Sequence, residues 1–405
     1  MKQNKLPLNT IFKQAKPVLE AIQRAGFEAY FVGGSIRDAL LDLPVNDVDI
    51  ATSAQPEEIK AIFKRTVDVG IEHGTVLVLW HSEPYEVTTF RTEDTYADHR
   101  RPDHVTFVRS LKEDLKRRDF TMNAIALASD GTLIDYFDGQ KAIAEHLIET
   151  VGVADERFNE DALRMMRAVR FQSQLGFKLA IEAVRSIAHY NYLLEKISIE
   201  RIQIEFEKLL LGKARSFGLK TMLATELYKF CPGFSQAKKP LTDLATTQYP
   251  VQNDSEAWAL LCYFMSKHDE FFNVRSFLKA WKLSNRLIEQ VEITLVGFVE
   301  RPIDPTADAW YLFKYGRDVL ERIEHLRIVL DQKNALQDIL TAYDCLPIKT
   351  SQELAVSGRD LLASFDKNPG PWVGKYLNLL LKKVVTGQIQ NTKTAILDYL
   401  NQTVK

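Results

Sequence analysis

The segment Tyr30–Thr52, with the sequence YFVGGSIRDALLDLPVNDVDIAT, constrains the fold of this chain most strongly. The apolar run Ala29–Val32 predicts a buried strand, and Gly33-Gly34 ends it where the backbone must bend sharply or approach a ligand closely. Ser35 is then expected to cap a short helix over Ile36–Leu41. The start of a helix beside paired glycines presents backbone N–H groups and a positive dipole end, which together favour a phosphate.

Two acids lie on the next expected strand, Val45–Ala51, which begins after Pro44. Because side chains alternate along a strand, Asp47 and Asp49 are expected on the same face. Neighbouring carboxylates repel unless a cation lies between them, and hard oxygen ligands suit Mg²⁺ that carries nucleotide phosphates. Either motif alone more often marks a polar turn, but here order, spacing and expected secondary structure agree. The segment therefore predicts a metal-dependent nucleotide site.

Two further strands are expected at Thr75–Trp80 and Tyr85–Phe90. Glu86 on the second strand is a candidate third acid for the same site, although a solvent-facing glutamate is the commoner situation. Residues 91–104 are charged and have no period, so they predict a polar loop. Such a loop either closes on substrate or lies on the surface, and composition alone does not separate these alternatives.

A second motif, LKRRDFTMNAIAL, follows at Leu115–Leu127. Arg118 in this motif is a candidate to bind a triphosphate, because a guanidinium donates several hydrogen bonds to phosphate oxygens. Asn123 is expected to hydrogen-bond a ribose hydroxyl or the backbone. Basic residues at a helix end also compensate the helix dipole, and that is their more common role.

A third motif lies within residues 156–171, which we expect to form one helix. On such a helix Asp161, Arg164 and Arg167 fall on the same side within two turns. A carboxylate accepts from an exocyclic amine, and a guanidinium donates to ring nitrogens and carbonyl oxygens, so this pair can recognise the edge of cytosine or adenine. Charged pairs on a wet helix face are the alternative interpretation.

The 405 residues suffice for about two to four domains. Strand patterns fade after about Lys141, and helical spacing continues to the end of the chain. No segment has the length and apolarity of a membrane span, and the amino-terminal residues lack the apolar core of a signal peptide, so we expect a cytoplasmic protein. The net charge of −2 argues against general coating of nucleic acid but allows a local basic groove. Neither the three cysteines nor the eight histidines have zinc-ligand spacing.

The motifs together resemble those of the bacterial class II CCA-adding enzymes, which are tRNA nucleotidyltransferases of the superfamily related to DNA polymerase β. The resemblance covers essentially the whole chain, and three motifs in the same order make it specific. The matching motifs are Gly33-Gly34-Ser35-x-Arg37-Asp38 with Asp47-x-Asp49, Arg117-Arg118-Asp119-Phe120-Thr121-x-Asn123-Ala124, Glu160-Asp161-x-x-Arg164-x-x-Arg167-Ala168-x-Arg170-Phe171, and Glu200-Arg201.

The resemblance implies an α+β fold, in which an N-terminal mixed-sheet nucleotidyltransferase head precedes an all-α neck, body and tail. The implied boundaries are 1–145 for the catalytic head, 146–215 for the neck with its base-recognising helix, 216–300 for the body and 301–405 for the tRNA-binding tail. The implied partners are tRNA, ATP and CTP without a membrane, and a homodimer is one possible assembly.

The activity implied is template-independent addition of C, C and A to the 3′ end of tRNA, with release of pyrophosphate. Asp47 and Asp49 would bind the cofactor Mg²⁺ as the catalytic pair of a two-metal phosphoryl transfer. The implied nucleotide-binding residues are Gly34, Arg37 and Arg118 for the triphosphate, Asp161 and Arg164 for the base, and Arg167 and Arg170 in support of that site.

Related activities form the alternatives: a poly(A) polymerase, a partial CC-adding or A-adding enzyme, or a non-catalytic tRNA-binding protein. The intact pair Asp47 and Asp49 argues against the last alternative, because simple binding does not need two acids facing a polyanion. The full activity is favoured by residues of the polar loop that CC-adding relatives lack, namely Asp98, Arg100, Arg101 and Pro102.

Overall fold

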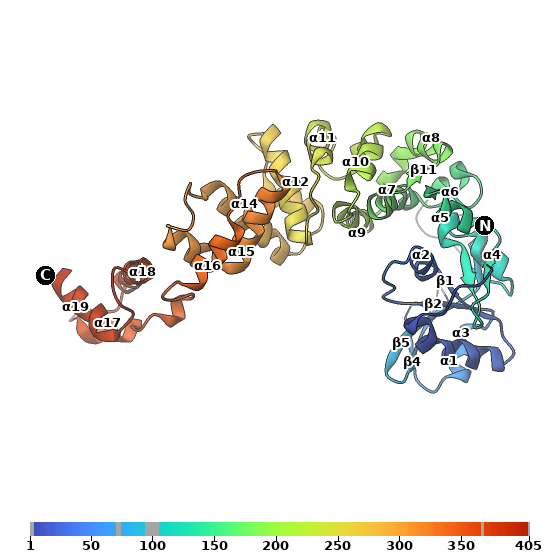
Figure 1. Ribbon diagram of the computed structural model, residues 1–405, viewed down its shortest axis with the longest axis horizontal. Coiled ribbons are helices and arrows are strands. Elements are labelled where there is room, and N and C mark those ends of the chain that lie inside the picture. Colours follow the sequence, from blue (N-terminus) through green and yellow to red (C-terminus); the bar gives the residue numbers. More distant parts are fainter. Residues whose placement is uncertain (1–3, 70–73, 94–104, 366–367, 404–405) are drawn as a thin grey trace. The chain divides into compact units, whose positions relative to one another are not determined.

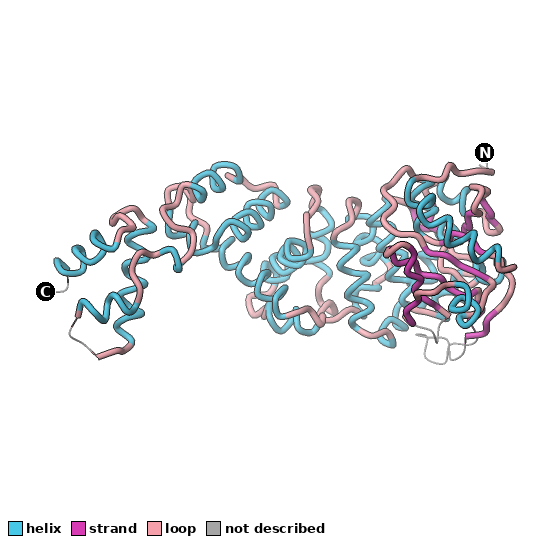
Figure 2. The backbone as a smooth tube through the Cα atoms, turned by 90° about the horizontal axis from the view of Figure 1, so that it is seen from below, coloured by secondary structure: helices cyan, strands magenta, loops and turns pink. Residues whose placement is uncertain are grey.

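The computed structural model describes residues 4–69, 74–93, 105–365 and 368–403. They form two compact units, Met1–Thr246 and Thr247–Lys405. The strands lie almost entirely in the amino-terminal part of the chain and helices make up the rest (Figures 1 and 2). This confirms the expected α+β class. The expected boundaries at 145, 215 and 300 stay predictions.

A seven-stranded mixed sheet organises the first unit, with the strand order β3-β4-β5-β2-β1-β8-β9. The pair β2 and β5 is parallel, and the other neighbours are antiparallel. The strands are β1 (Ala29–Val32), β2 (Asp49–Thr52), β3 (Thr66–Asp68), β4 (Thr75–Trp80), β5 (Glu83–Thr89), β8 (Ile125–Leu127) and β9 (Leu133–Asp135).

The two faces of this sheet have different partners. Helix α1 (Thr10–Arg24) covers one face, where Phe12 packs against Phe31 at 5.1 Å between ring centroids. It also contacts α3 (Pro56–Ile62). On the other face a core cluster includes Val32 with Leu111 and Leu115 of α4 (Leu111–Lys116). Because Val32 pairs with Asp49, the start of β2 presents its acid on this second face.

The remainder of the first unit consists of helices and two short strand pairs, of which the parallel pair β10 (Leu147–Ile148) with β11 (Lys178–Leu179) was not predicted by the sequence analysis. The 3₁₀ turns are η2 (Thr121–Asn123), η3 (Asn191–Lys196) and η4 (Leu227–Phe230). The helices are α2 (Gly34–Leu40), α5 (Gly139–Ala144), α6 (Ala154–Glu160), α7 (Leu163–Leu175), α8 (Ile181–Tyr190), α9 (Ile199–Leu210), α10 (Arg215–Ala224) and α11 (Lys238–Thr246).

Every secondary-structure element in the described residues of the second unit is a helix, and the unit has its own core, which includes Leu320, Ile323 and Val384. A buried ion pair joins Arg301 to Glu324 at 2.5 Å. No helix in the described part of the chain combines the length and apolar character that a membrane span needs. The elements are α12 (Asp254–His268), α13 (Val274–Ala280), α14 (Asn285–Glu300), α15 (Ala309–Val329), α16 (Leu336–Asp344), η5 (Ser351–Glu353), α17 (Gly358–Ser364), α18 (Pro371–Val385) and α19 (Lys393–Thr403).

The predicted strands Ala29–Val32 and Thr75–Trp80 are confirmed with those bounds. The polar loop was predicted to begin at residue 91, but Arg91–Glu93 forms the strand β6, which pairs with β7 (Val105–Phe107). Pairing between two segments that are distant in sequence gives no local signal, which explains this error. The residues of the loop that favoured full activity, Asp98 to Pro102, lie outside the described residues.

The close packing of α10 on α7 can be tested by a substitution at Gly218. A Cβ built on Gly218 would lie 2.3 Å from the backbone oxygen of Val169. We expect Gly218→Ala to destabilise the protein by about 1–3 kcal/mol, because backbone cannot yield as a side chain does. Thermal unfolding of both proteins measures this.

Gly374 in α18 serves as the control, because a Cβ there would meet nothing within 4 Å. Gly374→Ala should stabilise its helix by roughly 0.5–1 kcal/mol. Equal effects of the two substitutions would contradict the packing argument.

Candidate functional site

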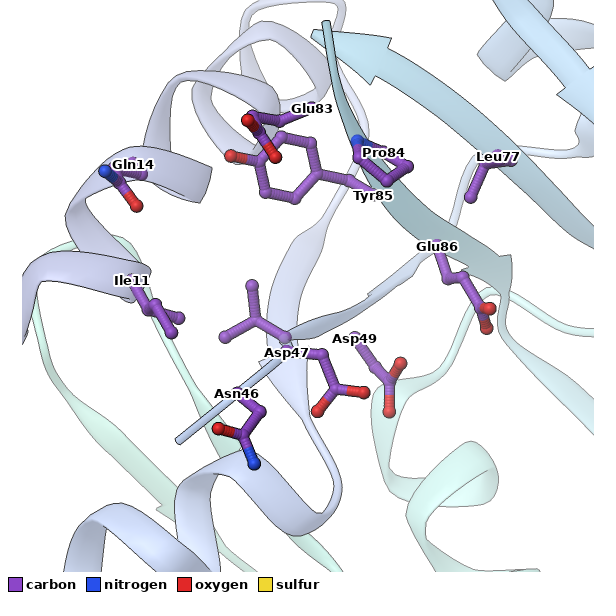
Figure 3. Close-up of a pocket in the computed structure, with 11 residues that line it drawn as sticks. Ile11, Gln14, Asn46, Asp47, Asp49, Leu77, Glu83, Pro84, Tyr85 and Glu86 are labelled. Atoms are coloured by element: carbon purple, nitrogen blue, oxygen red, sulfur yellow. The ribbon is translucent and has the colours of Figure 1, made fainter. Parts of the chain in front are cut away.

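Asp47 and Asp49 lie side by side at the start of β2, and their carboxylates point the same way (Figure 3). The predicted strand Val45–Ala51 is wrong at its beginning, because β2 starts only at Asp49 and Asp47 precedes it. Both acids are exposed, whereas Val48 between them is 7% exposed. The alternation that the sequence analysis expected therefore holds for the side chains, although Asp47 lies outside the sheet.

The electrostatics of the acid pair favour a cation. Although the Asp49 residue is exposed, its carboxyl lies close enough to the surrounding protein that desolvation raises its pKa; nearby Glu86 and Asp47 raise it further, and Arg118 lowers it. Glu86 occupies the position opposite Asp49 in the parallel register of β2 and β5. Hard oxygen donors that repel one another are the donor set that Mg²⁺ stabilises. The residues at this position fit a divalent cation.

Glu86 does not complete a preformed metal cluster. Within the ranges that the structure describes, no three His, Cys, Asp or Glu side chains are grouped as a metal site. Glu86 is exposed at its position on β5. The structure thus shows its effect on the pKa of Asp49 and leaves its contact with metal a prediction.

Gly33 lies beside both Asp49 and Arg118. Its φ of 84° lies in the left-handed region, and a Cβ there would lie 3.3 Å from Asp49 Oδ2 and 3.5 Å from Arg118 Nη1. A glycine is needed both for this conformation and for the space. The predicted cap by Ser35 is wrong, because Gly33 is the N-cap of α2 and the Ser35 hydroxyl donates to the Val32 carbonyl at 3.3 Å.

Arg37 is buried and held by its own neighbours. Its Nε and Nη2 donate to Asp38 Oδ1 at 2.9 and 2.7 Å, and Nη1 donates to Asn123 Oδ1 at 2.7 Å. Gly34 leaves room for this side chain, because a Cβ there would lie 3.3 Å from Arg37 Nη2. The structure thus fixes the orientation of Arg37 from inside the fold.

Arg118 is more accessible than Arg37, and its side chain is 18% exposed. Its Nη2 donates to Asp114 Oδ2 at 3.3 Å, and Arg117 pairs with the other oxygen of the same carboxylate at 2.9 Å. Burial alone would raise the pKa of Asp114, but Arg118 and Arg117 hold it below its ordinary value. Asp114 is therefore an ionised anchor for Arg118.

The prediction of one helix over residues 156–171 is wrong, because the helical conformation is interrupted at Asp161. Helix α6 ends at Glu160, Asp161 is extended with φ −133° and ψ 103°, and α7 begins at Leu163. Asp161 Oδ1 accepts from the Leu163 N–H at 3.0 Å, and Oδ2 accepts from Arg201 Nη2 at 3.0 Å. The sequence offered a local reason for the break, because Asp favours helix starts.

Arg164 is 6% exposed and points into the protein. It donates from Nη1 to Glu160 Oε2 at 2.7 Å and to the Arg157 carbonyl at 3.1 Å. Its Nη2 donates to the Arg117 carbonyl at 2.9 Å. The sequence analysis expected Asp161 and Arg164 on the same side of one helix. The structure does not place them so, because Asp161 lies between two helices and Arg164 is buried. Instead Arg164 links α7 to the chain beside Arg118.

Arg167 and Arg170 belong to a cluster that the sequence analysis identified only in part. Arg167 Nε donates to Asp119 Oδ2 at 2.7 Å, and Arg170 Nε forms an ion pair with Glu205 Oε2 at 2.6 Å. The ring of Phe171 lies 4.9, 5.5 and 3.7 Å from the guanidinium groups of Arg37, Arg167 and Arg170. Glu205 was missed, and its only signal is a charged residue on the apolar side of α9.

A pocket of about 390 Å³ reaches the two acids (Figure 3). At its other end lie Gln14 of α1 and Tyr85 of β5, on the side of the sheet that α1 covers. The pocket therefore passes around the end of β2, and Asp47 and Asp49 are open to a ligand from this direction.

Asp119 is a buried carboxylate of the site, and its pKa is strongly lowered. Burial alone would raise its pKa, but Arg167, Asn123 and the Phe120 N–H lower it from 3.8 to about 2. We expect Asp119→Asn to lower the free energy of unfolding by about 2 kcal/mol at neutral pH. Because the folded pKa lies below the unfolded one, this contribution is full above about pH 5 and is lost as the pH falls toward 2.

Urea unfolding of both proteins between pH 7 and 3 measures this difference, which should narrow as the pH falls. Asp155→Asn, on the exposed first turn of α6, is the control and should show a much smaller difference. A difference that stays constant down to pH 3 would contradict the assignment.

Comparison with known proteins agrees with these features. Residues 29–149 match the family described as Poly A polymerase head domain, residues 176–238 match "Probable RNA and SrmB- binding site of polymerase A", and residues 249–400 match tRNA nucleotidyltransferase domain 2. The chain is 50% identical over 391 residues to the CCA-adding enzyme of Enterococcus faecalis, covering 96% of this chain and 95% of the relative.

The CCA-adding enzyme of Limosilactobacillus fermentum is also 50% identical, over the whole length of both chains. The crystal structure of the Bacillus stearothermophilus CCA-adding enzyme in complex with CTP superimposes with a TM-score of 0.90 at 41% identity, and 98% of each chain is covered. The full-length identity, together with the paired acids and the arginine cluster, shows that this chain belongs to the family of CCA-adding enzymes.

Proposed function

We propose that this protein adds C, C and A to the 3′ end of tRNA from CTP and ATP, without a template, and releases pyrophosphate. The observation that carries the proposal is that Asp49 and Arg118 both lie beside Gly33. A nucleotidyl transfer needs carboxylates that bind a metal ion, and close to them a positively charged side chain that binds the phosphates. Full-length membership of the family supports the same conclusion.

Asp47 and Asp49 would hold Mg²⁺ in this proposal. The bound ion would neutralise the charge of the triphosphate and activate the 3′ hydroxyl of the tRNA. Before a cation binds, desolvation of the Asp49 carboxyl raises its pKa, and the charges of Glu86 and Asp47 raise it further. A cation therefore binds more tightly as the pH rises and Asp49 becomes ionised.

The triphosphate would bind between the start of α2 and Arg118. Gly34 leaves room for the Arg37 guanidinium beside the start of α2, and Arg118 approaches Gly33 with part of its side chain exposed. Arg37, which is 9% exposed, would support this site from behind. A triphosphate held this way is aligned before reaction, and alignment accounts for much of the rate of a phosphoryl transfer.

Asp161 and Arg164 would recognise the base of CTP or ATP. The Asp161 carboxylate is oriented by the Leu163 N–H and by Arg201, so it is a fixed acceptor for an exocyclic amine. Arg164 would have to leave Glu160 or a backbone carbonyl to contact a base. Arg167 and Arg170 would hold the start of α7 in place through Asp119 and Glu205.

A poly(A) polymerase is the second candidate, because residues 29–149 match a family described by that activity. Partial enzymes that add only CC or only A share the same head in the resemblance drawn from the sequence. The match of residues 249–400 to a tRNA nucleotidyltransferase domain favours tRNA as the substrate. A tRNA substrate also agrees with the cytoplasmic location that the sequence analysis expected.

The activity is tested with tRNA that lacks its 3′ trinucleotide, incubated with CTP, ATP and Mg²⁺. We expect growth by three nucleotides, no growth in EDTA, and recovery when Mg²⁺ is restored. Asp49→Asn should lower the rate by at least about a thousandfold, because it weakens the cation site. Glu57→Gln is the control and should stay within about twofold, since Glu57 is exposed on the first turn of α3 and is not among the residues that line the pocket at the acids.

Each other product of this assay identifies a different activity. A long adenylate tail would identify a poly(A) polymerase, and a stop after two nucleotides would identify a CC-adding enzyme. No product with wild-type protein would contradict the proposed function.

Asp161→Ala tests base recognition separately from tRNA binding. We expect the preference for CTP over UTP to fall by about tenfold or more, because the acceptor for the exocyclic amine is lost. The KM for tRNA should stay within about twofold, since a phosphate contact is not removed. An unchanged ratio of CTP to UTP incorporation would show that Asp161 does not recognise the base.

A further inference from the structure

A chain of hydrogen bonds crosses from α2 to α7 through Asn123. Arg37 Nη1 donates to Asn123 Oδ1 at 2.7 Å, and Asn123 Nδ2 donates to Asp119 Oδ1 at 3.1 Å. Arg167 Nε donates to Asp119 Oδ2 at 2.7 Å. Arg37, Asn123 and Asp119 are each less than a tenth exposed. The amide of Asn123 thus uses one end as an acceptor and the other as a donor, both inside the protein.

The chemistry of the two neighbours requires a neutral group at this position that both accepts and donates a hydrogen bond. Arg37 has only donors, and Asp119 stays ionised because its pKa is about 2, so it has only acceptors. A side chain between them must therefore accept on one side and donate on the other without adding charge. Asn123 meets this requirement, which explains a polar amide in the buried 3₁₀ turn η2.

The two ends of the chain are the arginines that the proposed function assigns to the triphosphate and to the base-recognising helix. Arg37 also donates from Nε and Nη2 to Asp38, and the Phe171 ring lies 4.9 Å from Arg37 and 5.5 Å from Arg167. Asn123 therefore connects the position of Arg37 to that of Asp119, and through Asp119 to that of Arg167.

We propose that Asn123 is a positioning residue that sets Arg37 relative to Arg167, so that the triphosphate site and the base-recognising helix are arranged as one unit. The inference rests on the proposed function for the identity of the nucleotide. It differs from the expectation that Asn123 binds a ribose hydroxyl, because both ends of its amide are already occupied by protein groups. A misplacement of about 1 Å in such a site costs roughly a hundredfold in rate.

The direct test is Asn123→Ala, with binding of inorganic tripolyphosphate measured by calorimetry in Mg²⁺ without tRNA. Loss of a hydrogen bond to a charged group should weaken this binding by about tenfold. In the extension assay the KM values for CTP and dCTP should rise by the same factor, so that their ratio is unchanged. The KM for tRNA should stay as in the wild type.

A ribose contact gives a different pattern. If Asn123 bound the 2′ hydroxyl, the substitution would weaken CTP and leave dCTP unaffected, and the proposal would be overturned. Unchanged tripolyphosphate binding would overturn it as well. Asn191→Ala is the matched control, since its amide donates to the Thr225 carbonyl at 2.9 Å and takes no part in the chain.

Asn123→Asp keeps the shape of the side chain and provides a second variant if Asn123→Ala folds poorly. The introduced carboxyl would be surrounded by Arg37 and Asp38 from α2 and by Asp119 and Arg167. Its oxygen would face Asp119 Oδ1, and two carboxylates in contact retain a proton between them. When protonated, the introduced group donates to Asp119 and accepts from Arg37, as the amide does.

Tripolyphosphate binding by Asn123→Asp should therefore be weak at pH 8 and approach that of the wild type, compared at the same pH, as the pH falls toward about 6. Asn123→Ala should show no such recovery. A constant deficit of Asn123→Asp across this range would overturn the proposal. Calorimetry does not depend on turnover, so it reports on Asn123 even if the wild-type protein fails to extend tRNA, an outcome that would refute the proposed function alone.

Discussion

The contact between Arg167 of α7 and the buried carboxylate of Asp119 is the interaction on which the site depends. Asp119 follows α4 beside the sheet, so this contact attaches the helical part of the first unit to the layer that carries the acids. A buried ion pair is favourable only when its remaining hydrogen-bonding atoms are also satisfied. Asn123 and the Phe120 N–H provide those partners, and the pKa of Asp119 falls to about 2 as a result.

Most arginines of the site are buried and paired, whereas Asp47 and Asp49 are exposed. Arg37, Arg164 and Arg170 are buried, and each is paired with a carboxylate, an amide or a carbonyl within the protein. Asp47 and Asp49 are exposed beside each other, and the charge of Arg118 opposes the effect of Asp47 on the pKa of Asp49. The guanidinium groups are thus part of a rigid frame, whereas a bound cation would relieve the repulsion between the acids. This contrast supports the proposed role of the acids as cation ligands.

Local patterns predicted those parts of the fold that depend on near neighbours in sequence. Ala29–Val32 and Thr75–Trp80 are apolar runs with clear ends, and the structure has them as strands with the same bounds. The side-by-side placement of Asp47 and Asp49 also followed from alternation. The break at Asp161 was missed because two short helices with similar periodicity look like one long helix. The strand at Arg91–Glu93 was missed because its partner is Val105–Phe107, and sequence spacing carries no signal for such pairing.

The sequence by itself determined the fold class, the strands Ala29–Val32 and Thr75–Trp80, the order of the motifs and the residue types of the site, because propensity, alternation and spacing act over a few residues. Only the tertiary structure decided which side chains pair. Arg201 of α9 holds Asp161, Glu205 of the same helix pairs with Arg170, and Asn123 joins Arg37 to Asp119. Such pairs are selected by burial, since a buried charge or amide must find a partner and the nearest partner lies on another element.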